Sequence, residues 1–338
     1  MMDSQTIYKL AIIYAKNIPF WNQENLSYLL NVLHKLQNLN VITIDVTNFS
    51  LNDIPTDLDI ITLVPNHSSI AVDFIKLNPN LRWIHCMWAG VDKFLSKKEI
   101  FDNDKIVLTN ARGAYADSLA EYSIFAMLYY SFNTNLYLKC FQNRKWEQPI
   151  NKMINKKTLT IVGYGLNGIQ LAKKAKYGFD MNVIGIKKNI INFPGKEYID
   201  EIYTLDQIDH ILPRTDFLVN ILPHTNETMN LFNYDKFKQM KSSSIFINIG
   251  RGSAVDEDDL IKALKDKLIQ GAALDVFKTE PLPSTSSFYD LDNVLISNHS
   301  ADNTDEYFKQ GVEVFIKNLE SYINNQQLIT IVDKIKGY

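Results

Sequence analysis

Residues 158–168 read TLTIVGYGLNG, an apolar run followed by three glycines in the spacing G-x-G-x-x-G. The run predicts a β-strand, and the residues after Gly168 predict a helix. In that setting Gly163 permits a tight turn, Gly165 lets a pyrophosphate approach the backbone, and Gly168 allows close packing of the helix on the strand. The free N–H groups at the helix start attract the same anion. The stretch therefore predicts a dinucleotide-binding turn made of Gly163, Tyr164, Gly165, Leu166, Asn167 and Gly168, and a purely structural turn is the alternative.

Five more apolar runs of strand length follow this turn, and helical segments separate most of them. They cover residues 183–186, 217–221, 244–249, 271–276 and 294–297. Together with residues 158–162 they predict a six-stranded parallel sheet of the Rossmann type.

The first hundred residues alternate in the same way. They predict a helix at residues 24–36 and parallel strands at residues 9–15, 41–46, 60–64 and 83–87. Residues 115–130 predict a long helix that is apolar around much of its circumference and must therefore be buried. A last helix is predicted at residues 302–324. The expected fold class is α/β, with two doubly wound parallel-sheet domains.

The composition is that of an ordinary globular protein. The 338 residues are 46% apolar and 22% charged, and the formal net charge is −3. This balance gives no reason to expect a nucleic-acid partner, and no run reaches the roughly 18 apolar residues of a membrane span. The first apolar run has the length of a strand rather than of a signal peptide, so we expect a cytoplasmic protein. Cys86 and Cys140 could form at most one disulfide, and the apolar surroundings of Cys86 favour a reduced thiol.

The end of the second strand bears on the choice of cofactor. An acidic residue commonly stands there and accepts hydrogen bonds from the adenosine ribose. Here the strand ends in Lys187 and Lys188. Lysines would attract a 2′-phosphate, so the sequence predicts NADP (NADPH) as the preferred cofactor, with NAD possible. Two solvated surface lysines without such a role are the alternative.

Three later segments carry chemically active side chains just after apolar strands. Arg251 lies between two glycines in INIGRG, Glu280 precedes a proline in ALDVFKTEP, and His299 lies in LISNHSAD. The carboxyl ends of parallel strands meet at one edge of a sheet, so these side chains can converge. Each could alone be structural: a cap or salt-bridge arginine, a solvated glutamate, a core or surface histidine. Their order after a dinucleotide turn favours one shared site.

Reduction of a keto acid needs a hydride donor, an anchor for the carboxylate and a proton donor for the carbonyl oxygen. The guanidinium of Arg251 can hold a carboxylate with two parallel hydrogen bonds. His299 can donate the proton, and a hydrogen bond to Glu280 would raise the pKa of His299 toward the working pH. We therefore expect these three residues to be catalytic, without a metal.

Taken together, these motifs resemble the D-isomer-specific 2-hydroxyacid dehydrogenase family, and the resemblance covers nearly the whole chain. It implies a flavodoxin-like substrate-binding domain, residues 1–110 plus 303–338, and an inserted dinucleotide-binding domain, residues 111–302. It also implies a hinge at Asn110 and a loop whose backbone N–H groups face the substrate carboxylate. That loop comprises Trp88, Ala89, Gly90 and Val91. The further residues implied to contact the cofactor are Leu222, Pro223, Thr225, Ile249 and Asp275.

Two positions depart from the family pattern. Asn298 replaces a common proline before the catalytic histidine, and Asp302 replaces a glycine. Asp302 suggests a branch similar to the glyoxylate/hydroxypyruvate reductases. The resemblance thus implies reduction of a small 2-keto acid, such as glyoxylate or hydroxypyruvate, to the D-2-hydroxy acid. A non-catalytic dinucleotide-sensing protein on the same fold and a formate- or phosphite-type dehydrogenase are the alternatives.

The helix at residues 115–130 carries more apolar surface than one sheet face can cover. Tyr137, Phe141 and Trp146, in residues 133–154, add to it. We therefore expect a twofold homodimer with a large apolar interface.

Overall fold

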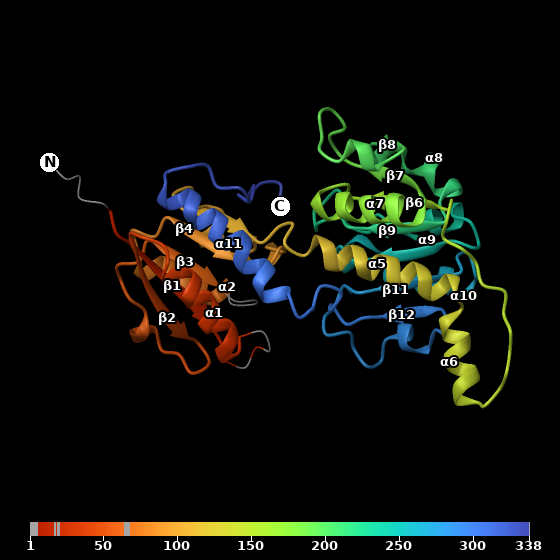
Figure 1. Ribbon diagram of the computed structural model, residues 1–338, viewed down its shortest axis with the longest axis horizontal. Helices are drawn as coiled ribbons and strands as arrows, with labels where there is room; N and C mark the ends of the chain where they lie inside the picture. The colour runs from red at the N-terminus through yellow and green to blue at the C-terminus, as the bar shows by residue number, and fades with distance from the viewer. Residues whose placement is uncertain (1–5, 17, 19–20, 64–67, 338) are drawn as a thin grey trace. The chain divides into compact units, whose positions relative to one another are not determined.

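The computed structural model describes residues 6–16, 18, 21–63 and 68–337. The chain divides into two compact units (Figure 1). Met1–Tyr115 and Asp305–Tyr338 form the first unit, and Ala116–Thr304 forms the second. Each unit is built on one parallel sheet, so the predicted fold class is confirmed. The sequence placed the two divisions after residues 110 and 302.

The sheet of the first unit has the strand order β2-β1-β3-β4-β5, and all its pairings are parallel. Its strands are β1 (Tyr8–Tyr14), β2 (Leu39–Asp45), β3 (Ile60–Leu63), β4 (Trp83–Cys86) and β5 (Val107–Asn110). Its helices are α1 (Gln23–Leu33), α2 (Ser68–Leu77), α3 (Asp92–Leu95), α4 (Lys98–Phe101) and α11 (Tyr307–Ile323). Val64, predicted at the end of the third strand, lies outside the described residues.

Strand β1 shows why helices cover both faces of this sheet. Successive side chains of a strand point to opposite faces. Leu10 and Ile12 accordingly join the core formed with α1 and α11, whereas Ala11 and Ile13 join the core formed with α2. A strand whose consecutive residues, here Leu10 to Ile13, are all apolar must be covered on both sides.

The second unit has seven parallel strands in the order β12-β11-β10-β9-β6-β7-β8. They are β6 (Thr158–Val162), β7 (Asn182–Ile186), β8 (Glu201–Tyr203), β9 (Phe217–Asn220), β10 (Ile245–Asn248), β11 (Gly271–Leu274) and β12 (Val294–Ile296). Six were predicted. The edge strand β8 was missed because it has only three residues, all of them half-buried, and no apolar run.

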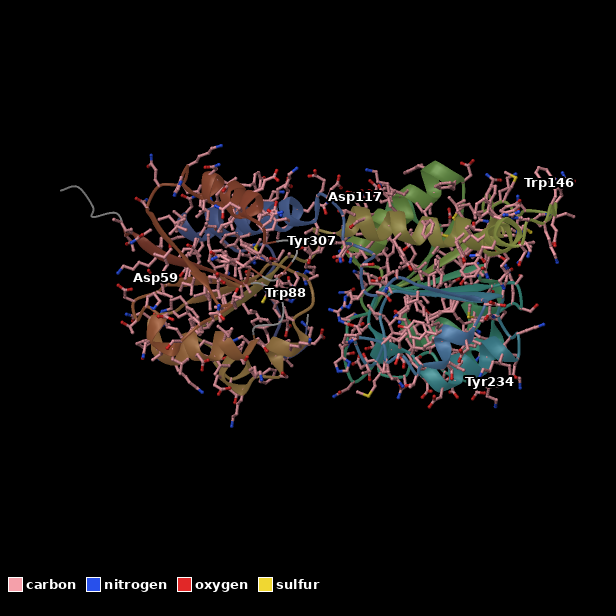
Figure 2. The ribbon with its side chains drawn as sticks, turned by 90° about the horizontal axis from the view of Figure 1, so that it is seen from below. Asp59, Trp88, Asp117, Trp146, Tyr234 and Tyr307 are labelled. Atoms are coloured by element: carbon pink, nitrogen blue, oxygen red, sulfur yellow. The ribbon has the colours of Figure 1, made fainter. Side chains whose placement is uncertain are left out.

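The longer helices of this unit are α5 (Ala116–Ser131), α6 (Thr134–Gln142), α7 (Leu166–Phe179), α9 (Tyr234–Gln239) and α10 (Glu257–Lys265), with a single turn at α8 (Ile208–Ile211). Helix α5 packs against α7 and β10. Nine of the sixteen residues of α5 are buried, whereas Phe125 remains 51% exposed in the single chain. Beyond α6, the side chain of Trp146 is 90% exposed (Figure 2).

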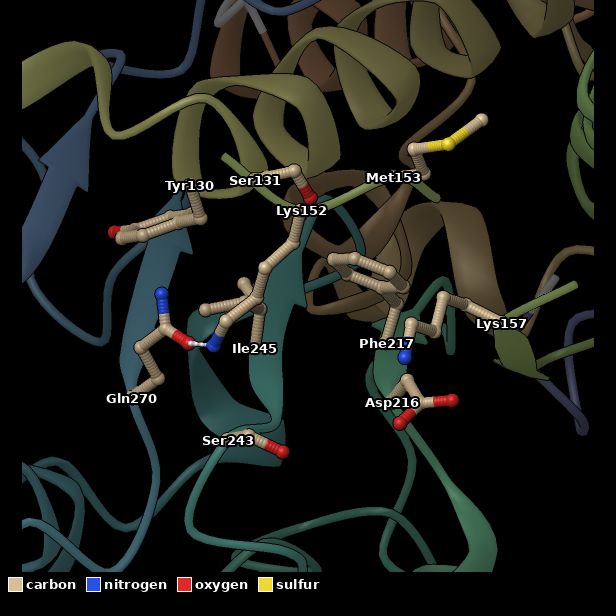
Figure 3. Close-up of a pocket in the computed structure, with 10 residues that line it drawn as sticks. All are labelled: Tyr130, Ser131, Lys152, Met153, Lys157, Asp216, Phe217, Ser243, Ile245 and Gln270. Atoms are coloured by element: carbon tan, nitrogen blue, oxygen red, sulfur yellow. Dashed lines mark hydrogen bonds between the residues drawn. The ribbon is translucent and has the colours of Figure 1, made fainter. Parts of the chain in front are cut away.

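A cavity of about 250 Å³ opens at the amino ends of β9 and β10. Its walls include Tyr130, Asp216 and Lys152, and the ammonium of Lys152 donates a 3.3 Å hydrogen bond to Gln270 (Figure 3). The glycine turn follows the carboxyl end of β6, at the opposite edge of the same sheet. The cavity is therefore separate from the site described next.

Candidate active site

The glycine turn leaves β6 at the point where the strand order of the sheet reverses. Strand β6 has β9 on one side and β7 on the other, and ligands of open α/β sheets bind outside the carboxyl ends of the strands at such a point. The N–H groups of Gly163 and Tyr164 both donate to the carbonyl of Ile186, at 3.0 and 2.9 Å. The turn is thus attached to the end of β7.

Two glycines of the turn meet different steric demands. Gly163 has φ +102°, and a Cβ there would lie 2.9 Å from the carbonyl carbon of Ile221, so a side chain is excluded. A Cβ at Gly165 would meet nothing within 4 Å. Gly165 is also the N-cap of α7, where no side chain satisfies the first N–H groups of the helix. Open space beside free N–H donors suits a pyrophosphate.

The two lysines after β7 have different partners. The ammonium of Lys187 donates to the carbonyl of Tyr164 at 2.9 Å, and burial lowers the pKa of Lys187. Lys188 instead contacts both carboxylate oxygens of Glu227, at 2.9 and 2.8 Å. Lys187 therefore supports the glycine turn, while Lys188 forms an ion pair with the loop that follows β9. The sequence predicted neither partner.

Four of the residues expected to contact the cofactor follow β9 and β10. Leu222, Pro223 and Thr225 belong to a loop in which the hydroxyl of Thr228 donates to the carbonyl of Pro223 at 2.8 Å. Ile249 is buried, and its N–H donates to Asn220. All of them lie at the carboxyl edge of the sheet, as the glycine turn does.

Arg251 follows β10, and Gly252 lets its turn pack against the neighbouring one. A Cβ at Gly252 would lie 1.9 Å from the carbonyl carbon of Phe277, so only glycine fits there. The N–H of Phe277 donates to Oε1 of Glu280 at 2.9 Å. The turns that carry Arg251 and Glu280 are therefore in direct backbone contact. The guanidinium of Arg251 also donates to the carbonyl of Gly250 at 2.8 Å.

His299 and Glu280 form a hydrogen-bonded pair. Nδ1 of the imidazole lies 2.7 Å from Oε2 of the carboxylate. The hydrogen bond and the charge of Glu280 raise the pKa of His299, although burial opposes them. Burial would raise the pKa of Glu280, but the hydrogen bonds from His299 and Phe277 hold it below its usual value. The geometry favours a protonated imidazole beside an ionised carboxylate.

The loop of His299 is held by Asp275, a role that the sequence did not suggest. Oδ1 of this buried aspartate accepts hydrogen bonds from the hydroxyl of Ser297 at 2.7 Å, from Ser300 N–H at 2.8 Å and from Ala301 N–H at 3.0 Å. Its backbone carbonyl also accepts from the N–H of His299 at 2.6 Å. Only the position of an aspartate just after a strand could have indicated this function.

Both departures from the family pattern have structural consequences in this loop. Asn298 has φ +55° and His299 has φ +53°. A proline, whose φ is fixed near −65°, could not adopt the conformation of Asn298. At the second position, burial and the negative charge of Asp275 raise the pKa of Asp302 to about 6. A carboxyl group that titrates near neutrality thus lies close to His299 and Arg251, whose positive charges act on it.

The predicted substrate loop belongs to the first unit. It follows β4, and Trp88 packs on Phe94 with ring centroids 5.6 Å apart. The amide of Asn110, the predicted hinge, donates to the carbonyl of Ala89 at 2.5 Å. The N–H of Ala111 donates to the carbonyl of Trp88 at 3.1 Å. These bonds occupy carbonyl groups of the loop and fix its conformation.

Neither a metal-binding cluster nor a membrane-spanning helix occurs in residues 6–16, 18, 21–63 and 68–337. No group of three or more histidine, cysteine, aspartate or glutamate side chains is arranged to hold a metal ion there. Over the same residues no helix combines the length and the apolar character needed to cross a bilayer.

A Rossmann sheet with a glycine turn at its reversal point, and with a histidine–carboxylate pair and an arginine at the same carboxyl edge, defines a nicotinamide-dependent oxidoreductase. The model for the NAD binding domain of D-isomer specific 2-hydroxyacid dehydrogenases matches residues 124–301. This chain belongs to that family.

Individual relatives agree with this assignment. A glyoxylate/hydroxypyruvate reductase B of Yersinia pestis is 30% identical over 282 residues, which cover 79% of this chain and 85% of the relative. A family member of solved structure, from Aeromonas salmonicida subsp. salmonicida A449, has 26% identity and a TM-score of 0.82, covering 97% of this chain and 100% of the other. An NADPH-dependent glyoxylate/hydroxypyruvate reductase from Sinorhizobium meliloti, solved with NADP and sulfate, has the same fold, with 24% identity, a TM-score of 0.81 and coverage of 98% and 100%.

Proposed function

We propose that this enzyme reduces a small 2-keto acid, such as glyoxylate or hydroxypyruvate, to the D-2-hydroxy acid with NADPH. The observation that carries the proposal is the 2.7 Å contact between His299 and Glu280 beside Arg251, at the sheet edge that holds the glycine turn. The name of the Yersinia relative supports the substrate class.

The catalytic roles follow from the charges of the three side chains. Arg251 binds the substrate carboxylate and orients the keto group, since a guanidinium matches a carboxylate with two parallel hydrogen bonds. His299 gives a proton from Nε2 to the carbonyl oxygen, because its Nδ1 is engaged by Glu280. Glu280 keeps the imidazole protonated and fixes its orientation. The backbone N–H groups of residues 88–91 supply further donors to the carboxylate.

The cofactor supplies the hydride when it is bound. Gly163–Gly168 hold its pyrophosphate at the start of α7. We assign the adenosine end to Lys187 and Lys188, and the nicotinamide end to Leu222, Pro223, Thr225, Ile249 and Asp275. In this proposal residues 116–304 form the dinucleotide-binding domain, and the rest of the chain forms the substrate-binding domain.

The test is a panel of 2-keto acids offered with NADPH and with NADH, followed by the loss of absorbance of the reduced cofactor. Turnover of glyoxylate or hydroxypyruvate, together with a His299→Ala variant about 10²–10⁴-fold slower, is the expected result. Cofactor binding without turnover of any keto acid would favour a non-catalytic dinucleotide sensor. Reduction of NAD by formate or phosphite would instead identify a formate- or phosphite-type dehydrogenase.

We further propose that the enzyme acts in the cytoplasm as a twofold homodimer. The support for the dimer is a run of exposed apolar side chains on α5, in the turn between α5 and α6, on α6 and in the segment that follows. They are Phe125, Phe132, Tyr137, Leu138, Phe141, Trp146, Ile150 and Met153. Exposed apolar groups concentrated in this way are typical of interfaces. Light scattering at low micromolar concentration should give twice the chain mass, and a monomer would refute the dimer.

A further inference from the structure

An ion pair links the two loops that flank the glycine turn. Lys188 follows β7 and Glu227 lies in the loop after β9, and these strands are the two neighbours of β6. The lysine ammonium contacts both oxygens of the glutamate, at 2.9 and 2.8 Å. Both side chains are largely exposed, at 71% and 67%. The pair therefore lies where a dinucleotide bound at the turn could reach it.

The two lysines are not equally available to an incoming anion. Lys187 is half-buried and donates to the carbonyl of Tyr164, so its position is set by the turn. The exposed ammonium of Lys188 is bound to a carboxylate that can be exchanged for another anion. Of the two, Lys188 is thus the cation that an incoming phosphate could contact.

We propose that Glu227 is a specificity-determining residue, whose carboxylate competes with the 2′-phosphate of NADPH for Lys188 and so limits the preference for NADPH over NADH. This inference rests on the proposed use of NADPH by the same site. NADH has a neutral 2′-hydroxyl in place of the phosphate and does not need to displace the glutamate. The effect of Glu227 should therefore be confined to the phosphorylated cofactor.

Coulomb energies explain why the Glu227 carboxylate can affect phosphate binding at Lys188. A phosphate in contact with Lys188 would stand within about 5–6 Å of the glutamate, and the energy between charges falls only as the inverse of their distance. Repulsion from Glu227 then cancels about half of the attraction to Lys188. Both groups are exposed, so added salt should weaken the effect of the glutamate.

The test is direct measurement of the Kd for NADPH and for NADH by quenching of protein fluorescence at low salt. Glu227→Gln should lower the Kd for NADPH about two- to fivefold and leave the Kd for NADH unchanged. Glu227→Asp keeps the charge and should stay near the wild type. Glu121→Gln is the matched control, because Glu121 is 69% exposed and pairs at 2.9 Å with Lys174 of α7 rather than with a residue next to the strand ends. It should leave both constants unchanged.

Two outcomes would overturn the inference. An unchanged Kd for NADPH in Glu227→Gln would show that the glutamate does not compete, and a raised Kd would show that it positions Lys188 for the phosphate instead. The cofactor proposal fails separately, if the wild type binds NADH more tightly than NADPH. Even in that case, a lower Kd for NADPH but not for NADH in Glu227→Gln would support competition between Glu227 and the 2′-phosphate for Lys188.

Discussion

Nδ1 of His299 lies 2.7 Å from Oε2 of Glu280, and Oε1 of the same carboxylate accepts the N–H of Phe277 at 2.9 Å. Both carboxylate oxygens are therefore engaged, one by the backbone of its own turn and one by the imidazole. The glutamate cannot rotate without losing a hydrogen bond. The imidazole is held by a rigid acceptor, which fixes its orientation and leaves Nε2 to carry the transferable proton.

The first prediction concerns the pH dependence of keto-acid reduction. Glu280 raises the pKa of His299, and the reaction needs the protonated imidazole. Activity should be full below this raised pKa and should fall as the pH rises through it. In Glu280→Gln the hydrogen bond loses its charge, so the fall should move to lower pH, toward the usual pKa of about 6.5. The measurement is kcat/KM from pH 5 to 9 for both proteins, and coincident profiles would refute the role of Glu280.

The second prediction concerns the carboxylate anchor. Arg251→Lys keeps the positive charge but loses the planar pair of donors. A hydrogen bond to a charged group is worth about 1.5–3 kcal/mol, so kcat/KM for the keto acid should fall about 10- to 100-fold. The Kd for the cofactor should not change. Unchanged kcat/KM would mean that the backbone of residues 88–91 is the main anchor.

The strands and the convergence of the site could be read from the sequence because their signals are local. A buried parallel strand is a continuous apolar run, and the end of such a strand marks the edge where ligands bind. Arg251 and His299 were identified in this way, and the structure places both at the carboxyl edge of one sheet. Glu280 was identified by its place after the same kind of strand.

The partners of the site could not be read from the sequence, because they depend on how loops fold back in space. Nothing in the neighbourhood of Lys188 indicates that it meets Glu227, which lies 39 residues away. The positive φ of Asn298 and the three hydrogen bonds to Oδ1 of Asp275 are tertiary features as well.

The third prediction concerns the support of the catalytic loop by Asp275. Asp275→Ala leaves the N–H groups of Ser300 and Ala301 without their acceptor, at a cost of about 1–3 kcal/mol in the free energy of unfolding. A loop that no longer aims His299 should also lower kcat, on the order of 10²-fold. Asp275→Asn keeps the Oδ1 acceptor and should recover most of both losses. Both losses can be measured, by thermal unfolding and by kcat. A wild-type kcat in Asp275→Ala would contradict a role for Asp275 in positioning His299.

The fourth prediction concerns Asp302 and stability. Its pKa is about 6 in the folded protein against 3.8 for the ordinary group, so the folded state holds the proton more tightly. Its contribution to stability is therefore present at low pH and lost as the pH rises from about 4 to about 6. Asp302→Asn should raise the free energy of unfolding at pH 8 by at most about 3 kcal/mol, and much less at pH 4.5. Asp290→Asn, at an exposed site, is the control. An equal increase in the free energy of unfolding at both pH values would show that titration of Asp302 is not the cause.

The last prediction separates the two lysines that the sequence treats alike. Lys188 is exposed and paired with a displaceable carboxylate, so Lys188→Gln should lower kcat/KM for NADPH several-fold, since exposed charge pairs contribute about 0.2–1 kcal/mol each. The same variant should leave NADH unaffected, because its ribose carries no phosphate.

Lys187 is bonded to the carbonyl of Tyr164 in the glycine turn. Lys187→Met should therefore weaken the turn itself and raise the KM for both cofactors together. The comparison is kcat/KM for NADPH and NADH at low and at high salt, where screening should reduce the NADPH preference of the wild type but not of Lys188→Gln. Loss of discrimination in Lys187→Met, with NADH kinetics intact, would mean that Lys187 reads the phosphate and that its bond to Tyr164 gives way when the cofactor binds.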